Sequence, residues 1–316
     1  MRYVLLPFVL FVSCSTTFGQ KQPIAFVDVS VIPMDSQRVL EHQTVLVRDD
    51  RIAAIGENDS VRVPAGALNI DGKGRYLMPG LVDMHAHFLR PPVPGVKEDI
   101  VFLDYHEKNA LFGLLYVANG VTSMRNLWGQ PETDKLSELF KSGELIGPTI
   151  YSSGPITDGD PSEISNARVV KTAEQARQAV RDDKAHGHVG IKIYDNLSLE
   201  AYKAIVDEAK KVGLPVFGHL PDAVPLEIAI QSHQASIEHV DGWLDDLQPN
   251  PATVGKMTTT ELMQQADFSK MAHFSKEMHD AGVWVCPTIV VFQMEWAKGH
   301  FGDGMNYFSA EFLTPI

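Results

Sequence analysis

The chain has 316 residues, of which 44% are hydrophobic, so it can bury the core of one large α/β domain with a smaller domain beside it. Its formal net charge of −13 argues against partners such as nucleic acid or an anionic membrane surface. Its N-terminal apolar run is too short to cross a bilayer, so no transmembrane span is expected.

The N-terminal segment resembles a secretory signal. Met1 and Arg2 are followed by an apolar stretch over residues 3–12. We expect a signal peptide over residues 1–19, cleaved before Gln20, and an exported protein, periplasmic or secreted. The alternative is a lipoprotein-type signal peptide, after whose cleavage Cys14 would carry a lipid anchor. Because Cys286 is the only other cysteine, the mature chain is expected to lack an internal disulfide.

Residues 22–78 contain strand-like segments separated by turn residues, at 25–32, 44–47 and 52–56. This pattern predicts a small N-terminal β-sheet domain. We interpret it as part of a β-sandwich that the chain leaves incomplete.

From residue 79 to 316 strands alternate with helices, which predicts a (β/α)₈ TIM-type barrel. Helices are expected from Ser198 to Gly213 and from Thr172, through a capping box with Gln175, to Gly187. We find seven strands and no eighth before the chain ends, so we expect a fragment of a longer protein. The seven are Leu81–His85, Thr122–Asn126, Thr149–Ser152, Gly190–Tyr194, Val216–His219, Ala235–His239 and Val283–Pro287.

His85 and His87 occupy the end of the first of these strands. Because side chains alternate along a strand, residues two apart share a face, and both imidazoles point the same way. Two neutral nitrogen donors so close together form half of a metal site.

Further ligand types occur at the ends of later strands. Lys192 lies inside strand four with inward parity, where an amine is costly unless it is paired or modified. Strands five and six end at His219 and His239. Either histidine alone fits a buried core residue, but together with the first pair they predict one cluster at the C-terminal mouth of the barrel.

A second His-x-His, formed by His186 and His188, precedes strand four. It should therefore lie at the opposite mouth and should not bind the same metal.

The motifs around these residues resemble the metal-dependent amidohydrolase superfamily, in its imidazolonepropionase-like and prolidase-like branch. The resemblance covers nearly the whole chain after the signal. It rests on the segments at residues 78–87, 120–126, 147–151, 191–195, 217–221 and 236–242.

The resemblance implies two divalent metal ions, usually zinc. His85 and His87 would bind the more buried ion, and His219 and His239 the more exposed one. Lys192 would be carboxylated and bridge both, because a carbamate is an anionic oxygen ligand whereas an ammonium is not. The family's strand-eight aspartate, a metal ligand and proton shuttle, has no counterpart. The nearest carboxylates that could replace it are Asp195 and Asp241.

The resemblance implies a hydrolase of carbon–nitrogen bonds other than internal peptide bonds, in dipeptides, N-acyl amino acids or cyclic amides. Lys192, His219 and His239 would be the catalytic residues. One alternative is a mononuclear deaminase or imidazolone-type ring hydrolase, for which a bridging carbamate has no use. Another is an inactive exported metal-binding fragment. A turnover much weaker than that of a longer chain is expected, and the oligomeric state, a homo-oligomer included, is left open.

Overall fold

A computed structural model of the chain describes residues 21–88, 105–164, 166–239, 242–249 and 259–290. The chain divides into two compact units, residues 1–79 and 80–316. The predicted signal peptide, with Cys14, lies outside the described residues, as does Asp241. Each unit is described by itself below.

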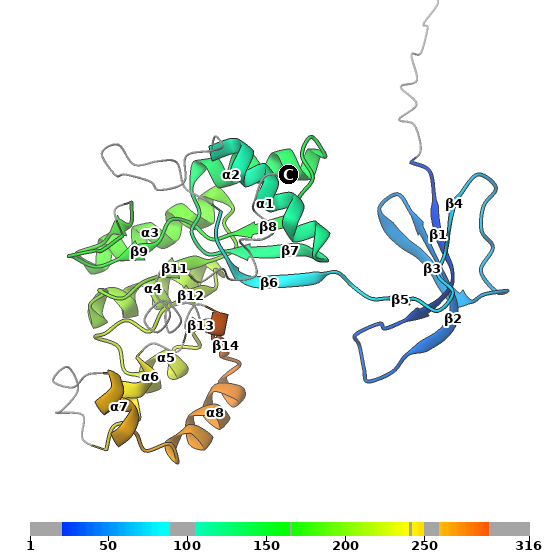
Figure 1. Cartoon of the computed structure of the whole chain (residues 1–316). Coiled ribbons are helices and arrows are strands. Elements are labelled where there is room, and N and C mark those ends of the chain that lie inside the picture. Colours follow the sequence, from blue (N-terminus) through cyan, green and yellow to red (C-terminus); the bar gives the residue numbers. More distant parts are fainter. Residues whose placement is uncertain (1–20, 89–104, 165, 240–241, 250–258, 291–316) are drawn as a thin grey trace, which may run out of the picture. The chain divides into compact units, whose positions relative to one another are not determined.

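Unit 1 is a single five-stranded sheet over the residues described (Figure 1). β1 lies centrally, antiparallel to β2 and parallel to both β4 and β5, and β3 pairs with β2. Val29, Val31 and Val45 form its small core. A second sheet, which would make a sandwich, stays a prediction. The strands are β1 (Ile24–Val31), β2 (Leu40–Arg48), β3 (Arg51–Glu57), β4 (Leu68–Asp71) and β5 (Tyr76–Leu77).

Unit 2 is an α/β structure in which every described strand pair is parallel. Two sheets run in the orders β6-β7-β8 and β10-β9-β11-β12-β13-β14. The seven main strands fall where the sequence places them, within two residues at each end. They are β6 (Leu81–Ala86), β7 (Val121–Asn126), β8 (Thr149–Ser152), β11 (Ile191–Ile193), β12 (Val216–Gly218), β13 (Ser236–Glu238) and β14 (Trp284–Cys286).

The two sheets meet at the segment that leads into β11. The backbone N–H of Val189 donates to the carbonyl of Ser152 at 2.9 Å, and that of Gly154 donates to Gly190 at 3.3 Å. The main strands therefore follow one another in chain order, as in the wall of a barrel. Two short strands, β9 (Thr157–Asp158) and β10 (Arg168–Val169), were not expected from the sequence. Closure with an eighth strand stays a prediction.

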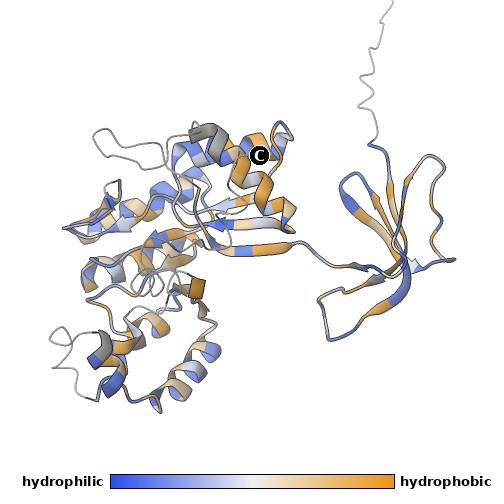
Figure 2. Ribbon diagram, in the orientation of Figure 1, coloured by the Kyte–Doolittle hydropathy of each residue, from blue (hydrophilic) through white to orange (hydrophobic). Residues whose placement is uncertain are grey.

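Helices alternate with these strands, and their amphipathic pattern explains how they cover the sheet. Figure 2 shows hydrophobic and hydrophilic residues alternating along α3, α4 and α8. Their apolar side chains pack with the outward residues of β11–β13 in the main core. No described helix is long and apolar enough to cross a membrane. The helices are α1 (Tyr105–Ala118), α2 (Pro131–Ser142), α3 (Ala173–His186), α4 (Leu199–Val212), α5 (Leu226–Gln231), α6 (Trp243–Asp246), α7 (Thr259–Gln265) and α8 (Lys270–Ala281).

The two helices predicted from capping signals are confirmed. Ser198 caps α4 by accepting from the N–H of Ala201, and Gly213 ends it in the left-handed conformation. Thr172 caps α3 by accepting from the N–H of Gln175, and Gly187 ends it in the same way.

Candidate metal centre

One pocket at the C-terminal ends of the unit 2 strands gathers the predicted site residues. Its lining consists of His85, His87, Trp128, Ile156, Ile164, Lys192, Tyr194, His219 and His239. The structure thus brings together all five residues that the sequence predicts as metal ligands, from β6, β11 and the residues that follow β6, β12 and β13. The remaining lining is aromatic and aliphatic, which limits the access of water.

Strand alternation explains why His85 and Lys192 face this pocket. On β6 the outward residues Val82 and Met84 are exposed, whereas the side chain of His85 is only 6% exposed. On β11 the flanking residues Ile191 and Ile193 belong to the core beneath the helices. Lys192, between them, therefore points to the opposite side.

His85 and His87 have their Nε2 atoms 3.2 Å apart, with ring planes at 88°. Two imidazole nitrogens that share one tetrahedral zinc ion, at about 2.0–2.1 Å each, lie about 3.3–3.4 Å apart. The pair already has the separation that a shared ion requires.

The other two imidazoles lie close to this pair. The ring of His239 is 4.7 Å from that of His85 and 4.7 Å from that of His219, centroid to centroid. Tyr194 is tilted over His219 at 4.1 Å. The four imidazoles thus form one continuous cluster.

Three of these imidazoles have Nδ1 in contact with an oxygen. His85 contacts Glu238 at 2.7 Å, His219 contacts Asp195 at 2.6 Å, and His239 contacts the hydroxyl of Thr288. An oxygen partner on one ring nitrogen orients the ring and directs the other nitrogen to a metal. This is the arrangement found around metal-ligating histidines.

Backbone geometry places the two later histidines. β13 ends at Glu238, and strict alternation would direct His239 to the same outer side as Ile237. His239 instead adopts φ +63°, which turns its side chain into the pocket. The left-handed backbone, and not strand alternation, therefore places His239 in the pocket where the sequence predicts it. Gly218, at φ +137°, lies against the carbonyl of Ile193, where a Cβ would approach to 2.2 Å.

Among the residues of the pocket, Lys192 is the one whose burial is least favourable in free energy. It is 1% exposed, and its Nζ has no hydrogen-bond partner among the described residues. Burial lowers its pKa to about 8, with the attraction of Glu238 opposing part of this effect. A buried amine without a partner calls for a ligand or a chemical modification.

The histidines are held in the neutral form that binds metals. Burial lowers the pKa of His219 to about 2 and that of His239 to about 3. His87 is exposed at the rim, yet partial burial and then the charge of His85 lower its pKa to about 3. The pKa of His85 is also lowered by burial, against the hydrogen bond with Glu238. The donor set therefore fits divalent zinc.

Two charged residues next to the pocket were not assigned from the sequence. Glu238 is fully buried and pairs with Arg125 at 2.6 Å. The signal was available, since a charged residue inside a strand must be paired when it faces inward. Arg125 is on β7 next to Met124, and Glu238 is on β13 next to Ile237. Because Met124 and Ile237 face the outer core, Arg125 and Glu238 face inward.

A second possible ligand triad is formed by His85, Glu238 and Cys286, whose ligand atoms lie within 4.8 Å of one another. We interpret it as structural. Glu238 is already neutralised by Arg125, and burial raises the pKa of Cys286, which keeps its sulfur a thiol and a poor ligand.

The second His-x-His lies elsewhere. His186 ends α3 and contacts the carbonyl of Asp182 through Nδ1 at 2.7 Å, and His188 contacts Asp183 at 3.3 Å. Both precede β11, at the end of that strand opposite the pocket, and neither lines the pocket.

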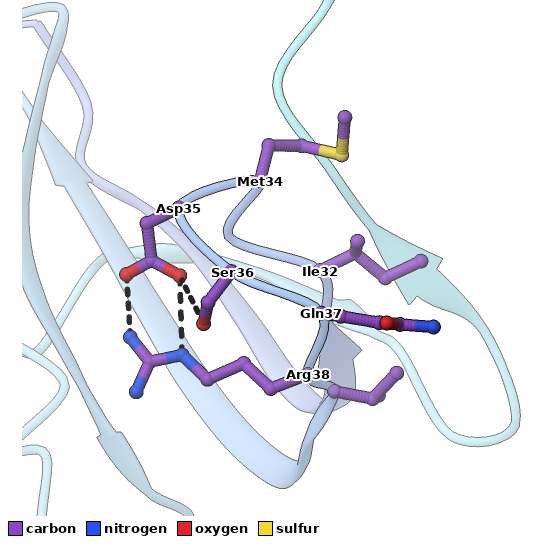
Figure 3. A pocket seen from close by; sticks show the side chains of 7 residues that line it. Ile32, Met34, Asp35, Ser36, Gln37 and Arg38 are labelled. Atoms are coloured by element: carbon purple, nitrogen blue, oxygen red, sulfur yellow. Dashed lines mark hydrogen bonds and ion pairs between the residues drawn. The ribbon is translucent and has the colours of Figure 1, made fainter.

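Unit 1 has a surface pocket of its own, in the connection between β1 and β2 (Figure 3). Asp35 and Arg38 face each other there, with Nη2 of Arg38 2.5 Å from the carboxylate. Because these two charges neutralise each other, this pocket offers no reactive group comparable to the histidine cluster.

No family model matches the chain. Among characterised proteins it is 24% identical over 217 residues to a 5-methylthioadenosine/S-adenosylhomocysteine deaminase of Symbiobacterium thermophilum, covering 61% of this chain and 48% of that protein. It is 31% identical over 186 residues to a dihydroorotase of Lactobacillus helveticus, covering 58% and 38%. The chain thus spans less than half the length of either relative.

Solved structures share the fold. Bottromycin amidohydrolase superposes with a TM-score of 0.65 at 24% identity, over 90% of this chain and 56% of that one. A Xaa-Pro dipeptidase with bound methionine gives a TM-score of 0.63 at 21% identity, over 88% and 70%. The sequence matches and this shared fold agree with the motifs, and the chain is similar to proteins of the amidohydrolase superfamily.

Proposed function

We propose that the protein is a metal-dependent hydrolase of carbon–nitrogen bonds outside ordinary internal peptide bonds, in the prolidase-like branch of the amidohydrolase superfamily. The observation that carries this proposal is the convergence of four imidazoles and one buried amine on a single pocket. The names of the structural neighbours, an amidohydrolase and a dipeptidase, support the reaction class.

In this proposal the pocket holds two divalent ions, zinc by the nature of the ligands. His85 and His87 hold one, as their Nε2 separation of 3.2 Å suits, and His219 and His239 hold the other. Lys192 would supply a further oxygen ligand as the carbamate that forms when CO₂ adds to its neutral amine and one proton is lost. The support for this modification is that Nζ is buried and lacks a partner among the described residues, so that an added carboxylate would replace an unfavourable group with a ligand.

Bound ions of this kind activate water and polarise a carbonyl group. The protein's own residues prepare that chemistry. Trp128, Ile156 and Ile164 surround the histidines with apolar surface, which limits the water around the reacting bond. Glu238, Asp195 and Thr288 fix the imidazole orientations.

Asp195 already has a partner in the pocket. Its Oδ1 lies 2.6 Å from Nδ1 of His219, so we assign it the orientation of that ring. Asp241, the other carboxylate considered from the sequence, lies outside the described residues.

As substrates we propose dipeptides, N-acyl amino acids or cyclic amides. A second candidate function is a mononuclear deaminase or ring hydrolase, which the match to a deaminase favours. The buried Lys192 separates the two, because a site with one metal ion has no use for a bridging carbamate.

The test is a metal count on the purified chain, by mass spectrometry of the elements, together with hydrolysis of a panel of dipeptides, N-acyl amino acids and cyclic amides. Two ions per chain, together with release of an amino acid from a dipeptide or N-acyl amino acid or with opening of a cyclic amide, support the proposal. One ion with ammonia release would support the deaminase, and no bound metal would contradict both and leave a non-catalytic protein.

A further inference from the structure

We propose that Glu238 is the positioning residue of His85, fixing the tautomer that presents the Nε2 lone pair to the pocket, and that Arg125 holds Glu238 in place. This inference rests on the proposed function in so far as Nε2 is the atom that would bind a metal. The tautomer itself is a property of the metal-free protein.

The first step is the contact between the two side chains. Oε2 of Glu238 lies 2.7 Å from Nδ1 of His85, and the side chains are 0% and 6% exposed. A carboxylate only accepts hydrogen bonds, so Nδ1 must carry the proton. With the proton on Nδ1, a neutral imidazole has its lone pair on Nε2, which lies beside Nε2 of His87.

The second step is what keeps Glu238 an acceptor. Arg125 donates from Nη2 to Oε1 of Glu238 at 2.6 Å, and the hydroxyl of Ser236 donates to the same oxygen. Oε1 is therefore fully engaged with donors. Oε2 remains for His85, and the cationic partner stabilises the ionised form in a buried place.

The third step concerns the backbone. Nε of Arg125 donates to the carbonyl of Met84 at 2.7 Å, the residue before His85, and Nη1 donates to Ser236 at 2.9 Å. One guanidinium thus ties β6, which carries His85, to β13, which carries Glu238. The ring of Phe217 lies beneath it, 4.7 Å from Cζ. The distance between His85 and Glu238 is fixed from both strands.

His219 provides the contrast within the pocket. Its partner Asp195 has a side chain that is 38% exposed, whereas Glu238 is 0% exposed. Water can replace Asp195 as an acceptor but cannot replace Glu238. The loss of Glu238 should therefore have the larger effect.

The test reads histidine tautomers in the metal-free 316-residue protein by long-range ¹H–¹⁵N correlation after ¹⁵N-histidine labelling. The signal of His85 is assigned by its loss in His85→Asn. In the wild type we expect Nδ1–H. In Glu238→Gln the amide oxygen keeps the hydrogen bonds of Arg125 and Ser236, so the NH₂ group faces Nδ1, which must accept, and the tautomer should invert to Nε2–H.

The matched control is Asp183→Asn. Asp183 is 1% exposed and, like Glu238, lies between an arginine and a histidine, Arg168 at 2.5 Å and His188 at 3.3 Å. This variant loses an ion pair with a similarly buried carboxylate, away from the pocket. It should leave the tautomer of His85 and the affinity for zinc unchanged, while Glu238→Gln should lower zinc affinity about 10- to 100-fold.

Nε2–H on His85 in the wild-type protein would overturn the inference even if Glu238→Gln does not fold. So would an unchanged tautomer in a folded Glu238→Gln, or an equal loss of zinc affinity in Asp183→Asn, which would indicate general destabilisation. A wild-type protein that shows Nδ1–H but binds no zinc would contradict the proposed function and leave the positioning role of Glu238 intact.

Discussion

The molecule contains two His-x-His pairs with the same spacing in the sequence, and their surroundings differ. His85 and His87 have Nε2 atoms 3.2 Å apart, inside a pocket with two further histidines and a buried lysine. His186 and His188 have nearly parallel rings 5.8 Å apart, and neither lines that pocket.

Both pairs also lie next to a buried arginine–carboxylate ion pair. Glu238 with Arg125 supports His85, and Asp183 with Arg168 contacts His188. The difference is the end of the strand at which each pair occurs. At the C-terminal ends, later strands deliver His219 and His239 to the same place, whereas the pair before β11 receives no such convergence among the described residues. A motif becomes a candidate site only where several strands add to it.

The sharpest way to break this comparison is to remove each pair in turn. His85→Ala/His87→Ala should abolish binding of the ion that we propose for these residues, and all hydrolysis with it, because two proposed ligands are lost together. His186→Ala/His188→Ala should retain the wild-type metal content. Metal per chain after dialysis, measured for both double variants, decides the matter. Loss of metal from His186→Ala/His188→Ala would mean that the metal binds at this pair and not in the pocket.

Lys192→Met tests how much the buried amine of Lys192 destabilises the metal-free protein. Burial lowers the pKa of Lys192 from 10.5 to about 8, a difference of 2.5, which corresponds to about 3 kcal/mol at neutral pH. Replacing the amine with an apolar group of similar size should therefore raise the free energy of unfolding of the metal-free protein by roughly that amount, and should abolish binding of the second ion.

Urea unfolding of the metal-free variant checks the value, with Lys203→Met as its control. Lys203 is exposed on α4, so its replacement should change stability by less than about 0.5 kcal/mol. A destabilised Lys192→Met would show that the amine has a partner of structural value.

Asp195→Asn tests whether the hydrogen bond between Asp195 and His219 contributes to zinc binding. Asp195 accepts from Nδ1 of His219 at 2.6 Å, and loss of such a partner should lower zinc affinity about 10-fold, at the weaker end of the range for such changes because Asp195 is partly exposed. Zinc titration against a competing chelator measures the change. Asp207→Asn, an exposed position on α4, provides the control and should have no effect. Equal affinity in both variants would remove Asp195 from the site.

The smallest effect expected is the response of the metal-free protein to acid. The pKa of His219 is about 2 in the folded state against 6.5 for an ordinary histidine, so the unfolded chain takes up the proton first as the pH falls. Stability is therefore full above about pH 6.5 and declines below it, by about 1 kcal/mol between pH 6.5 and 5.5 for this residue. Urea unfolding across that range, in the wild type and His219→Gln, should show a shallower decline in the variant. Parallel curves would contradict the lowered pKa.

Much of the fold could be predicted from the chain alone, because local rules agree with the tertiary structure. Ser198 and Gly213 bound α4 as capping preferences require, and the seven main strands lie where apolar runs occur. β9 and β10 escaped prediction because each has two residues and is held by long-range pairing, including Thr157 with Ile193. In unit 1 only one sheet is described, so the predicted sandwich stays untested.

For the candidate site, the sequence by itself determined which metal-ligating side chains are available and at which strand ends they occur. Because side chains alternate along a strand, Lys192 points to the opposite side of the sheet from its neighbours Ile191 and Ile193. The sequence did not determine how His239 reaches the pocket, because the left-handed backbone at that residue departs from the alternation of side chains along a strand. Nor did it pair Arg125 with Glu238, which are 113 residues apart. Their pairing arises where β7 and β13 face each other across the interior, and there a buried charge must find its opposite.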